Sequence, residues 1–196
     1  MQEGDKIPFI GYEWRVLDIR GGSALIITEK VIESRPYHHT RTDTTWADSE
    51  IRRFLNGDFI GRFDPLDISR VIPTCNANPD NPWYGSKGGA DTQDRLFLLS
   101  IEEAACKYFG DSSEILSNPG TQKYKYWFNR KDGENNLKRL TNGSWWLRSP
   151  GRNNRVAAYI HGLCYNQLDS SGGCVGINGN GITSHGGLRP ALWLKI

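Results

Sequence analysis

Cysteine and histidine side chains are the first candidates for chemistry in this sequence. Of the four cysteines, only Cys164 and Cys174 form a pair worth testing for a bridge, and free thiols are the better expectation in a chain without an export signal. No Cys-x-x-Cys motif is present, which argues against a structural zinc site. His38 and His39 could bind a metal, but no acidic or histidine partner lies at a telling spacing. The sequence therefore predicts no metal site and no cofactor.

Catalysis is not predicted either. No Ser-His-Asp set and no pair of carboxylates can be placed in one site from the sequence. Nothing near Cys164 or Cys174 suggests an activating base. We therefore expect a protein that binds a ligand and is not an enzyme.

Large residues near the C-terminus could form a binding site of their own. Arg148 and Arg189 could clamp an anion, and Trp145, Trp146 and Trp193 could form an aromatic cage. Their apolar neighbours favour another interpretation, in which the tryptophans are buried and the arginines donate hydrogen bonds to backbone carbonyls. These five residues are expected to form a rigid frame.

The frame encloses a segment of different composition, and the two together make up residues 144–196. Ser144–Gly151 and Gly187–Leu194 are dense in Trp, Leu, Arg and Pro, whereas the insert between them is rich in Gly, Asn, Ser and Tyr. Tyr provides contact area at low entropic cost, and Ser, Gly and Asn provide adaptable hydrogen bonds. Binding is therefore expected on the insert, with an unknown protein or other macromolecule as the ligand.

The insert also lacks four residue types. Arg152–Gly187 contains no Lys, Glu, Trp or Met, although the chain has 9 Lys, 9 Glu, 7 Trp and 1 Met, and simple proportion gives about five such residues in the insert. None of the four types can be reached from the Asn codon AAC by changing its adenines, whereas every residue of the insert except Gln167 can. Surface loops rich in turns are also poor in Lys and Glu, which is the alternative explanation.

A variable surface should expose its polar side chains on one face and bury the apolar residues between them, as the alternation of strands requires. The apolar residues expected to point inward are Ala157, Ala158, Ile160, Val175 and Ile177. The expected ligand-binding residues are Asn153, Asn154, Tyr159, His161, Tyr165, Asn166, Asp169, Ser170, Ser171, Asn178, Asn180, Ser184 and His185.

Charge and hydropathy argue against two classes of partner. The formal net charge is +2 and no basic run marks a surface that follows phosphates, so nucleic acid is not an expected partner. No apolar run approaches the ~20 residues of a membrane span, so no membrane insertion is expected. The first residues lack the pattern of a signal peptide, which predicts a cytoplasmic location unless a partner carries the protein to the surface. The oligomeric state stays open.

The first part of the chain predicts a hairpin and a helix. Glu13–Ile19 and Ala24–Ile27 are short β-rich runs on either side of Arg20-Gly21-Gly22, which has the length and composition of a hairpin turn. Thr45-Trp-Ala-Asp48 fits a capping box, which predicts that Thr45 caps a helix. Gly57 is placed to end that helix.

The middle of the chain alternates between short helices and polar segments. Asp64-Pro65 predicts a second, shorter helix, and Cys75–Asp94 is a loop too polar for regular structure. Arg95–Leu99 is predicted to be a buried strand, and Ser100-Ile-Glu-Glu103 is a capping box that opens a further helix. Asp111–Asn142 is expected to leave the core, with an aromatic cluster at Tyr124, Tyr126, Trp127 and Phe128.

Four short strands are predicted in the last part of the chain. They are Trp145–Arg148, Val156–Ile160, Cys174–Ile177 and Ala191–Leu194. Capped helices followed by a β-rich half indicate an α+β protein. No internal repeat or linker is present, so a single domain is expected.

A set of short motifs runs in a fixed order along almost the whole chain. The motifs are Trp14–Asp18, Arg35–Tyr37, Leu55–Gly57, Gly88–Thr92, Phe97–Ser100, Trp145–Gly151 and Arg189–Trp193. The set resembles an uncharacterised bacterial family, domain of unknown function 6273, and the last two motifs are the most specific. That family resembles the C-type lectin fold. Some members look like the variable proteins of diversity-generating retroelements, in which adenine-directed mutagenesis rewrites a C-terminal segment.

The resemblance implies one C-type-lectin-like domain over residues 1–196. Two principal helices would pack on a small antiparallel sheet, the N- and C-terminal strands would pair, and residues 144–196 would carry the variable, ligand-binding surface. Classical sugar binding is not implied. The insert has Asp169 as its only acid for holding calcium, and it lacks the usual Pro-containing sugar-binding tripeptide.

Two alternatives stay open. The formylglycine-generating oxidases share the C-type lectin fold and use a pair of cysteines, and Gly187-Leu-Arg189 is similar to a motif near their end. The ten-residue separation of Cys164 and Cys174 departs from that family. The other alternative is a structural accessory domain of a larger assembly, because the family that the chain resembles looks modular.

Overall fold

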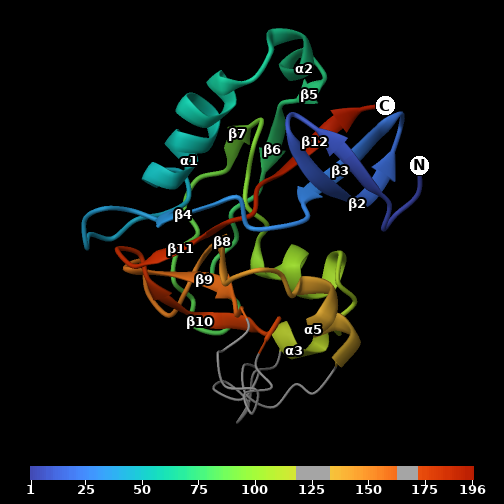
Figure 1. Cartoon of the computed structure of the whole chain (residues 1–196). Helices are drawn as coiled ribbons and strands as arrows, with labels where there is room; N and C mark the ends of the chain where they lie inside the picture. Colours follow the sequence, from blue (N-terminus) through green and yellow to red (C-terminus); the bar gives the residue numbers. More distant parts are fainter. Residues whose placement is uncertain (118–132, 163–171) are drawn as a thin grey trace.

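Two sheets, with short helices at their edges, make up most of the fold. The computed structural model describes residues 1–117, 133–162 and 172–196 (Figure 1). Within these ranges the strands form two five-stranded sheets and one two-stranded sheet. The α+β class expected from the sequence is confirmed. The expectation of one small antiparallel sheet is wrong, because the N-terminal hairpin and the C-terminal segment each pair with strands from elsewhere in the chain.

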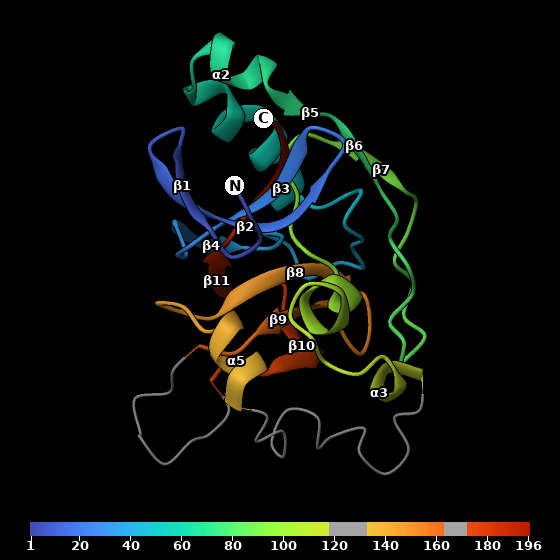
Figure 2. The same ribbon diagram turned by 90° about the vertical axis from the view of Figure 1, so that its right-hand side faces the viewer.

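The first sheet contains the strands nearest to both ends of the chain. In spatial order its strands are β1 (Lys6–Phe9), β2 (Tyr12–Arg20), β3 (Ser23–Thr28), β12 (Ala191–Lys195) and β5 (Val71–Ile72). All neighbours are antiparallel, and β2 and β3 form the expected hairpin. β12 pairs with β3, so the C-terminal strand closes against the hairpin and the two termini lie on the same side of the molecule (Figure 1, Figure 2).

The second sheet contains most of the C-terminal segment. In spatial order its strands are β10 (Val175–Gly181), β9 (Val156–Ile160), β8 (Trp145–Pro150), β11 (His185–Leu188) and β4 (Glu33–Pro36). Its pairs are antiparallel except that β8 and β11 are parallel. The four strands expected in this part of the chain are confirmed by β8, β9, β10 and β12. No local signal marks β4 and β11, since Pro36 and the Gly186-Gly187 pair are both unfavourable in strands.

The helix expected after Thr45 begins later than the sequence suggests. α1 spans Glu50–Phe54, and its N-cap is Ser49, whose hydroxyl accepts a hydrogen bond from the Arg52 amide. The Thr45 hydroxyl instead donates to the Asp48 carboxylate at 2.8 Å. The capping box at Thr45 is therefore wrong, because its two side chains bond to each other and not to a helical backbone.

The same helix runs past Gly57. It continues as η1 (Leu55–Phe59), a π-helical turn, and η2 (Ile60–Arg62), a 3₁₀ turn. Phe59 is buried and its ring centroid lies 5.8 Å from that of Phe54. This packing outweighs the cost of one glycine in a helix, about 1 kcal/mol, so the expected end at Gly57 is wrong.

Two other expected helix starts are confirmed. α2 (Pro65–Ser69) has Asp64 as its N-cap. The Ser100 amide donates to the Glu103 carboxylate at 2.9 Å, and the Glu103 amide donates to the Ser100 hydroxyl at 3.2 Å, which is the reciprocal capping box. The helix that this box opens includes η3 (Glu103–Lys107).

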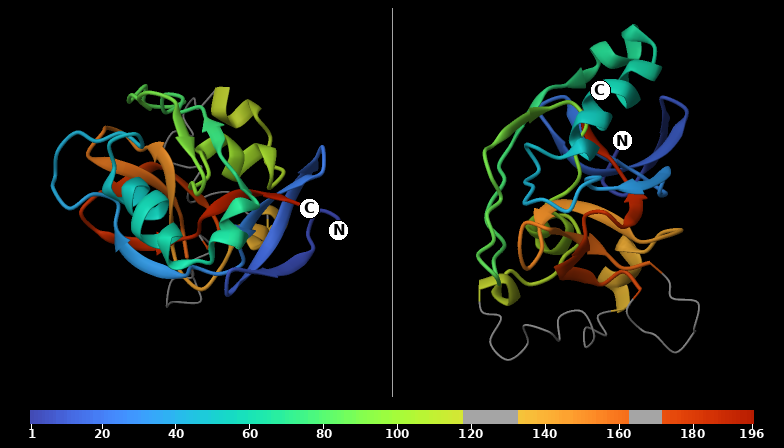
Figure 3. Two further views of the ribbon diagram at one scale, coloured as in Figure 1. Left: turned by 90° about the horizontal axis from the view of Figure 1, so that it is seen from above. Right: turned by 90° about the vertical axis from the view of Figure 1, so that its left-hand side faces the viewer.

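The long polar segment after Cys75 is held at both ends. β6 (Thr74–Asn76) and β7 (Thr92–Asp94) pair in antiparallel fashion, so the expectation of a wholly irregular loop is wrong. Between them the chain runs along one side of the molecule from the first sheet to the second (Figure 3). The sequence predicts a buried strand over Arg95–Leu99. Residues 96–99 are buried and Arg95 is exposed, but Phe97 makes only an isolated bridge to Ala191, so the predicted strand is wrong.

The described residues of the segment expected to leave the core include two short helices. α3 (Glu114–Ser117) and α5 (Gly133–Arg139) are its described parts, and α5 lies beside the second sheet (Figure 1, Figure 2). The expected aromatic cluster at Tyr124, Tyr126, Trp127 and Phe128 lies outside the described residues. Across the three described ranges, no helix is long and apolar enough to cross a membrane.

Candidate ligand-binding surface

The second sheet divides the insert into accessible polar positions and buried apolar ones. At most 1% of the surface is exposed for each of the apolar residues Ala157, Ala158, Ile160, Val175 and Ile177. Among the expected ligand-binding residues, Asn153, Asn180, Ser184 and His185 are exposed, whereas Asn154, Tyr159, His161 and Asn178 are half-buried. The remaining five, Tyr165, Asn166, Asp169, Ser170 and Ser171, lie outside the described residues. None of the eight described candidates is buried.

The eight candidates come from neighbouring strands and turns. The turn between β8 and β9 meets the turn after β10 at one end of the sheet, where Gly181 pairs with Val156 and the Ile182 amide donates to the Arg155 carbonyl. The candidates at or beside this end are Asn153, Asn154, Asn178, Asn180 and Ser184, and His185 follows as the first residue of β11. Tyr159 lies farther along β9, and His161 follows directly after the end of this strand. The set therefore extends along the length of β9.

Tyr159 belongs to a row of rings that crosses the sheet. Its neighbours in register are Trp146 and Gly176, and its ring centroid lies 6.5 Å from that of Trp146 and 5.7 Å from that of His161. A Cβ atom on Gly176 would stand 2.5 Å from the Tyr159 ring, and one on Gly186 would stand 2.4 Å from the Trp146 ring. Glycine is therefore required where these two rings lie against the backbone.

Trp145 and Trp146 form the buried frame that the sequence predicts. Each has about 1% of its surface exposed. The Trp145 indole donates to the Arg139 carbonyl at 3.2 Å, and the Trp146 indole donates to the Arg35 carbonyl at 3.1 Å. Both indoles therefore combine large apolar burial with a satisfied N–H group.

Arg148 and Arg189 are buried and donate to backbone carbonyls, as expected. Arg148 donates to the Leu98 carbonyl at 2.8 Å and forms an ion pair with the Glu103 carboxylate. Arg189 Nε donates to the Thr28 carbonyl at 2.7 Å. Desolvation lowers the pKa of Arg189 to about 10, so its guanidinium remains charged at neutral pH.

Trp193 does not belong to the buried frame. It is half-buried on β12, whereas Leu192 and Leu194 on either side of it are buried. Successive residues of a strand point to opposite faces, so the side chain between two core leucines points away from the core. The guanidinium of Arg20 lies 6.0 Å from the centroid of the Trp193 ring. The expectation that Trp193 is buried is therefore wrong.

Arg139 is a frame residue that the sequence did not reveal. It has 1% of its surface exposed, forms an ion pair with the buried Asp111 at 3.0 Å and donates to the Gly173 carbonyl at 2.7 Å. Gly173 comes just before β10, so Arg139 fixes the point at which the insert enters that strand. It lies in the polar stretch Asp111–Asn142, where no pattern distinguishes a buried arginine from an exposed one.

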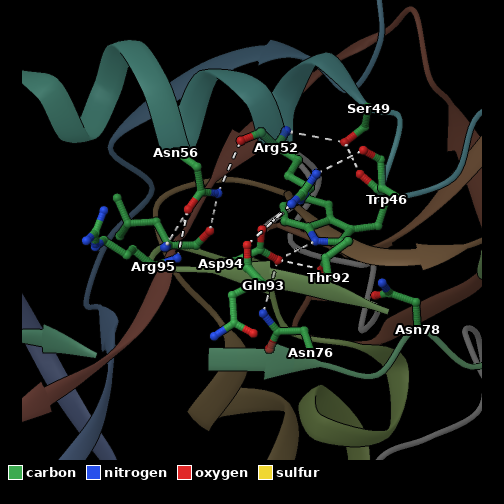
Figure 4. Close-up of polar contacts among 12 residues, drawn as sticks. Trp46, Ser49, Arg52, Asn56, Asn76, Asn78, Thr92, Gln93, Asp94 and Arg95 are labelled. Atoms are coloured by element: carbon green, nitrogen blue, oxygen red, sulfur yellow. Dashed lines mark hydrogen bonds and ion pairs between the residues drawn. The ribbon is translucent and has the colours of Figure 1, made fainter. Parts of the chain in front are cut away.

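A buried carboxylate holds the start of the long loop in place. Asp94 has 2% of its surface exposed and forms an ion pair with Arg52 at 2.6 Å (Figure 4). Its second oxygen accepts hydrogen bonds from the Trp46 indole, the Asn76 amide and the Thr92 hydroxyl. The network joins α1 to β6 and β7. Both oxygens of this carboxylate accept hydrogen bonds from protein groups, so we assign Asp94 a structural role.

The loop between β6 and β7 reaches the candidate surface through polar side chains. The Asn81 amide donates to the carbonyls of Pro150 and Ile177 at 2.8 and 2.9 Å, and the Ser86 hydroxyl donates to the Gly151 carbonyl. These bonds hold the backbone of β8 and β10. One candidate residue is itself tied to the loop, because the Asn154 amide donates to the Lys87 carbonyl at 2.7 Å.

Acid is expected to weaken the frame through Glu103. Burial acts to raise the pKa of this carboxyl, but the charge and hydrogen bonds of Arg148 outweigh it and hold the pKa below its usual value. A carboxyl of depressed pKa stabilises the folded state above the unfolded pKa of about 4.3, and this contribution is lost as the pH falls through the folded pKa. Urea unfolding at a series of pH values should show a smaller acid-induced loss of stability in Glu103→Gln than in the wild type. Equal pH slopes in the two proteins would contradict this role.

The histidines and cysteines occupy other settings. Within residues 1–117, 133–162 and 172–196, no three His, Cys, Asp or Glu side chains come together as a metal site. His39 pairs with the Glu50 carboxylate, and His38 Nδ1 lies 4.0 Å from the same group. Cys174 is buried and its Sγ accepts a hydrogen bond from the Asn136 amide at 3.4 Å. Cys164 lies outside the described residues, so its expected pairing with Cys174 stays a prediction.

Comparison with known proteins relates the chain to a protein family. No curated protein and no solved structure matches it. The family described as "Domain of unknown function (DUF6273)" matches residues 21–196. Because the match covers most of the sequence, the chain belongs to the DUF6273 family.

Proposed function

We propose that this protein binds a macromolecular ligand through its C-terminal surface, and that adenine-directed mutagenesis varies this surface on a C-type-lectin-like scaffold. The observation that carries the proposal is the division of the insert into accessible polar and buried apolar positions. A binding surface that changes its residues needs a backbone that does not depend on them. None of the eight described candidates is buried, and of these the Asn154 amide donates to the Lys87 carbonyl and Asn153 accepts from the Arg155 amide.

Several contacts that hold the backbone of the insert come from outside it, which supports the proposal. Arg139 binds the Gly173 carbonyl, and Asn81 binds the Ile177 carbonyl. Both bonds end on backbone oxygens, which are the same whatever side chain the position carries. Substitution of Asn180 or Ser184 would leave both contacts intact.

The composition of the insert supports its variation. Every residue of Arg152–Gly187 except Gln167 is of a type that adenine changes in an AAC codon can produce. The accessible Tyr159 and His161 have adjacent rings, with centroids 5.7 Å apart. Rigid aromatic side chains surrounded by small polar ones are typical of binding surfaces that adapt to many ligands.

Combined substitution at exposed positions is expected to leave the fold intact. We would replace Asn153, Asn180, Ser184 and His185 together by Tyr, Ser, Asn and Asp, all of which AAC-derived codons can encode. Surface substitutions usually change stability by less than ~0.5 kcal/mol each, so the melting temperature should fall by a few degrees at most. The control variant Ile177→Asn places an amide in the core and should cost about 2–4 kcal/mol. Calorimetric melting of the fourfold variant at the temperature of the control would contradict the proposal.

A displayed library tests the binding part of the proposal. Randomisation of these four positions with Tyr159 and His161 should yield variants that bind a test protein such as lysozyme. The matched library randomises six other exposed positions, Gln2, Glu3, Lys6, Pro8, Glu13 and Lys195. Enrichment from the first library and none from the second is the expected result. Equal enrichment, or none from either library, would count against a dedicated C-terminal surface.

A further inference from the structure

We propose a second binding site, for a free aromatic amino acid, in a cavity between the tip of the first sheet and the helix that follows Ser100. The cavity has a volume of about 350 Å³, which lies in the range of roughly 300–1,000 Å³ of sites for small molecules. None of its lining residues belongs to the candidate ligand-binding surface. The two proposals are therefore independent.

Aromatic side chains line this amino-acid cavity. Phe97 is buried, whereas Trp193 and Tyr108 are half-buried and contribute accessible ring surface. Trp193 comes from the Arg-Pro-Ala-Leu-Trp motif near the C-terminus, and its exposure has no role in the frame described above. A planar side chain on the ligand would match these rings.

The indole N–H of Trp193 is available to a ligand. The indoles of Trp14, Trp46, Trp145 and Trp146 each donate to a protein oxygen. The Trp193 indole donates to no group in the described part of the chain. Since such N–H groups usually find a partner when they leave bulk water, a ligand carboxylate is a suitable acceptor.

The charges of the cavity select a zwitterion. Arg148 is neutralised by Glu103, and Arg20 is neutralised by Asp18 at 2.6 Å. Lys107 and Glu102 also line the cavity, and neither forms an ion pair with a described residue. Lys107 Nζ lies 5.2 Å from the centroid of the Tyr108 ring. Its ammonium has no ion-pair partner among the described residues, nor has the Glu102 carboxylate, and the two groups match the α-carboxylate and α-ammonium of a free amino acid.

A larger cavity beside α1 has one carboxylate, Asp58, that is unpaired in the described part of the chain, but its arginines all have carboxylate neighbours. Its volume is about 580 Å³, and its arginines include Arg35, Arg53 and Arg62. Arg35 lies 3.3 Å and Arg62 lies 3.9 Å from Glu33, and Arg53 lies 3.8 Å from Glu50. Because its arginines already have carboxylate neighbours, this cavity is a poorer candidate for binding a ligand carboxylate.

Titration by NMR tests the amino-acid site. L-phenylalanine, L-tyrosine and L-tryptophan are the probes, and at least one should bind with a Kd of about 1 mM or below, as expected for a ligand of this size. Binding should shift the indole N–H resonance of Trp193, which is identified by its loss in Trp193→Phe. No saturable shift with any of the three probes at about 5 mM would overturn the proposal.

Two charge variants separate the roles of the wall residues. Lys107→Gln and Glu102→Gln should each weaken binding of the amino acid about tenfold, the effect of one charge-assisted hydrogen bond. 3-Phenylpropionate should be sensitive only to Lys107→Gln, and phenethylamine only to Glu102→Gln. Lys138→Gln and Glu134→Gln on α5 are the matched controls and should leave binding unchanged. Unchanged affinity in both wall variants would overturn the proposal, and the fourfold surface variant should bind the probes as the wild type does.

Discussion

Replacement of Asp94 by alanine is expected to lower the free energy of unfolding by about 3–5 kcal/mol, as for other broken buried ion pairs. The carboxylate is buried and forms an ion pair with Arg52 at 2.6 Å. Its removal leaves the Arg52 Nε–H, the Trp46 indole and the Asn76 amide without this acceptor. Urea denaturation at neutral pH, followed by circular dichroism, would measure the change.

An exposed aspartate of the same loop provides the control. Asp80 pairs with Lys87 at 2.7 Å, but both side chains are largely exposed and surface pairs of this kind add little to stability. Asp80 also accepts a hydrogen bond from the Gly88 amide at 3.1 Å, so Asp80→Ala should unfold at a urea concentration close to that of the wild type. If Asp94→Ala also unfolded at the wild-type urea concentration, the buried network would not contribute to stability and the structural role assigned to Asp94 would be wrong.

Replacement of Arg139 by alanine is expected to have an effect of similar size, about 3–5 kcal/mol, because it leaves the Asp111 carboxylate buried without its cation. It also removes the donor to the Gly173 carbonyl at the start of β10. Hydrogen exchange should therefore accelerate more at the amides of Val175 and Ile177 than at those of β2 and β3. Urea denaturation measures the global effect, and exchange measures where it is greatest.

A double substitution distinguishes loss of the ion pair from loss of packing. Arg139→Met combined with Asp111→Leu removes both charges and keeps much of the buried volume, so it should be more stable than Arg139→Ala. Lys138→Ala on the same helix is exposed and should change stability by less than ~0.5 kcal/mol. A double variant less stable than Arg139→Ala, or an equal effect of Lys138→Ala, would contradict the role given to Arg139.

Local sequence signals predict several elements of this fold correctly. The Gly-Gly turn between β2 and β3, the Asp64 cap of α2 and the Ser100–Glu103 capping box each depend on residues that are close in sequence. In β9 the accessible Tyr159 and the buried Ile160 fit local alternation, although the consecutive residues Ala157 and Ala158 are both buried. Such signals need no knowledge of distant partners.

Features that depend on distant partners could not be predicted. Ser49 replaces Thr45 as the cap of α1, and Trp46 in the preceding turn is committed to Asp94, which is far away in the sequence. Arg139 is buried because Asp111 and Gly173 converge on it in three dimensions. The pairing of β4 with β11 likewise brings together segments that have no strand signal of their own.

The candidate surface could be predicted from local sequence signals, whereas the amino-acid cavity could not. Composition and alternation were enough to identify Asn153, Tyr159 and Asn180 as accessible. The cavity requires the positions of Trp193, Tyr108 and Lys107, which are brought together from distant parts of the sequence. A local signal does indicate that Trp193 is accessible. Leu192 and Leu194 on either side of it point into the core, so Trp193 points to the opposite face of the strand. The density of tryptophans in the frame favours burial instead.

The most direct test of the proposed function is the sequence of the 3′ end of the gene in independent isolates, read beside the neighbouring DNA. Adenine-directed variation predicts an adjacent near-copy of this end and a reverse transcriptase gene. Differences between isolates should fall where the near-copy has adenine, in codons such as those of Asn153, Asn180 and His185, while the codons of the buried Ala158 and Ile160 stay the same. Differences spread evenly over buried and exposed codons, or a gene without the near-copy, would contradict the proposal.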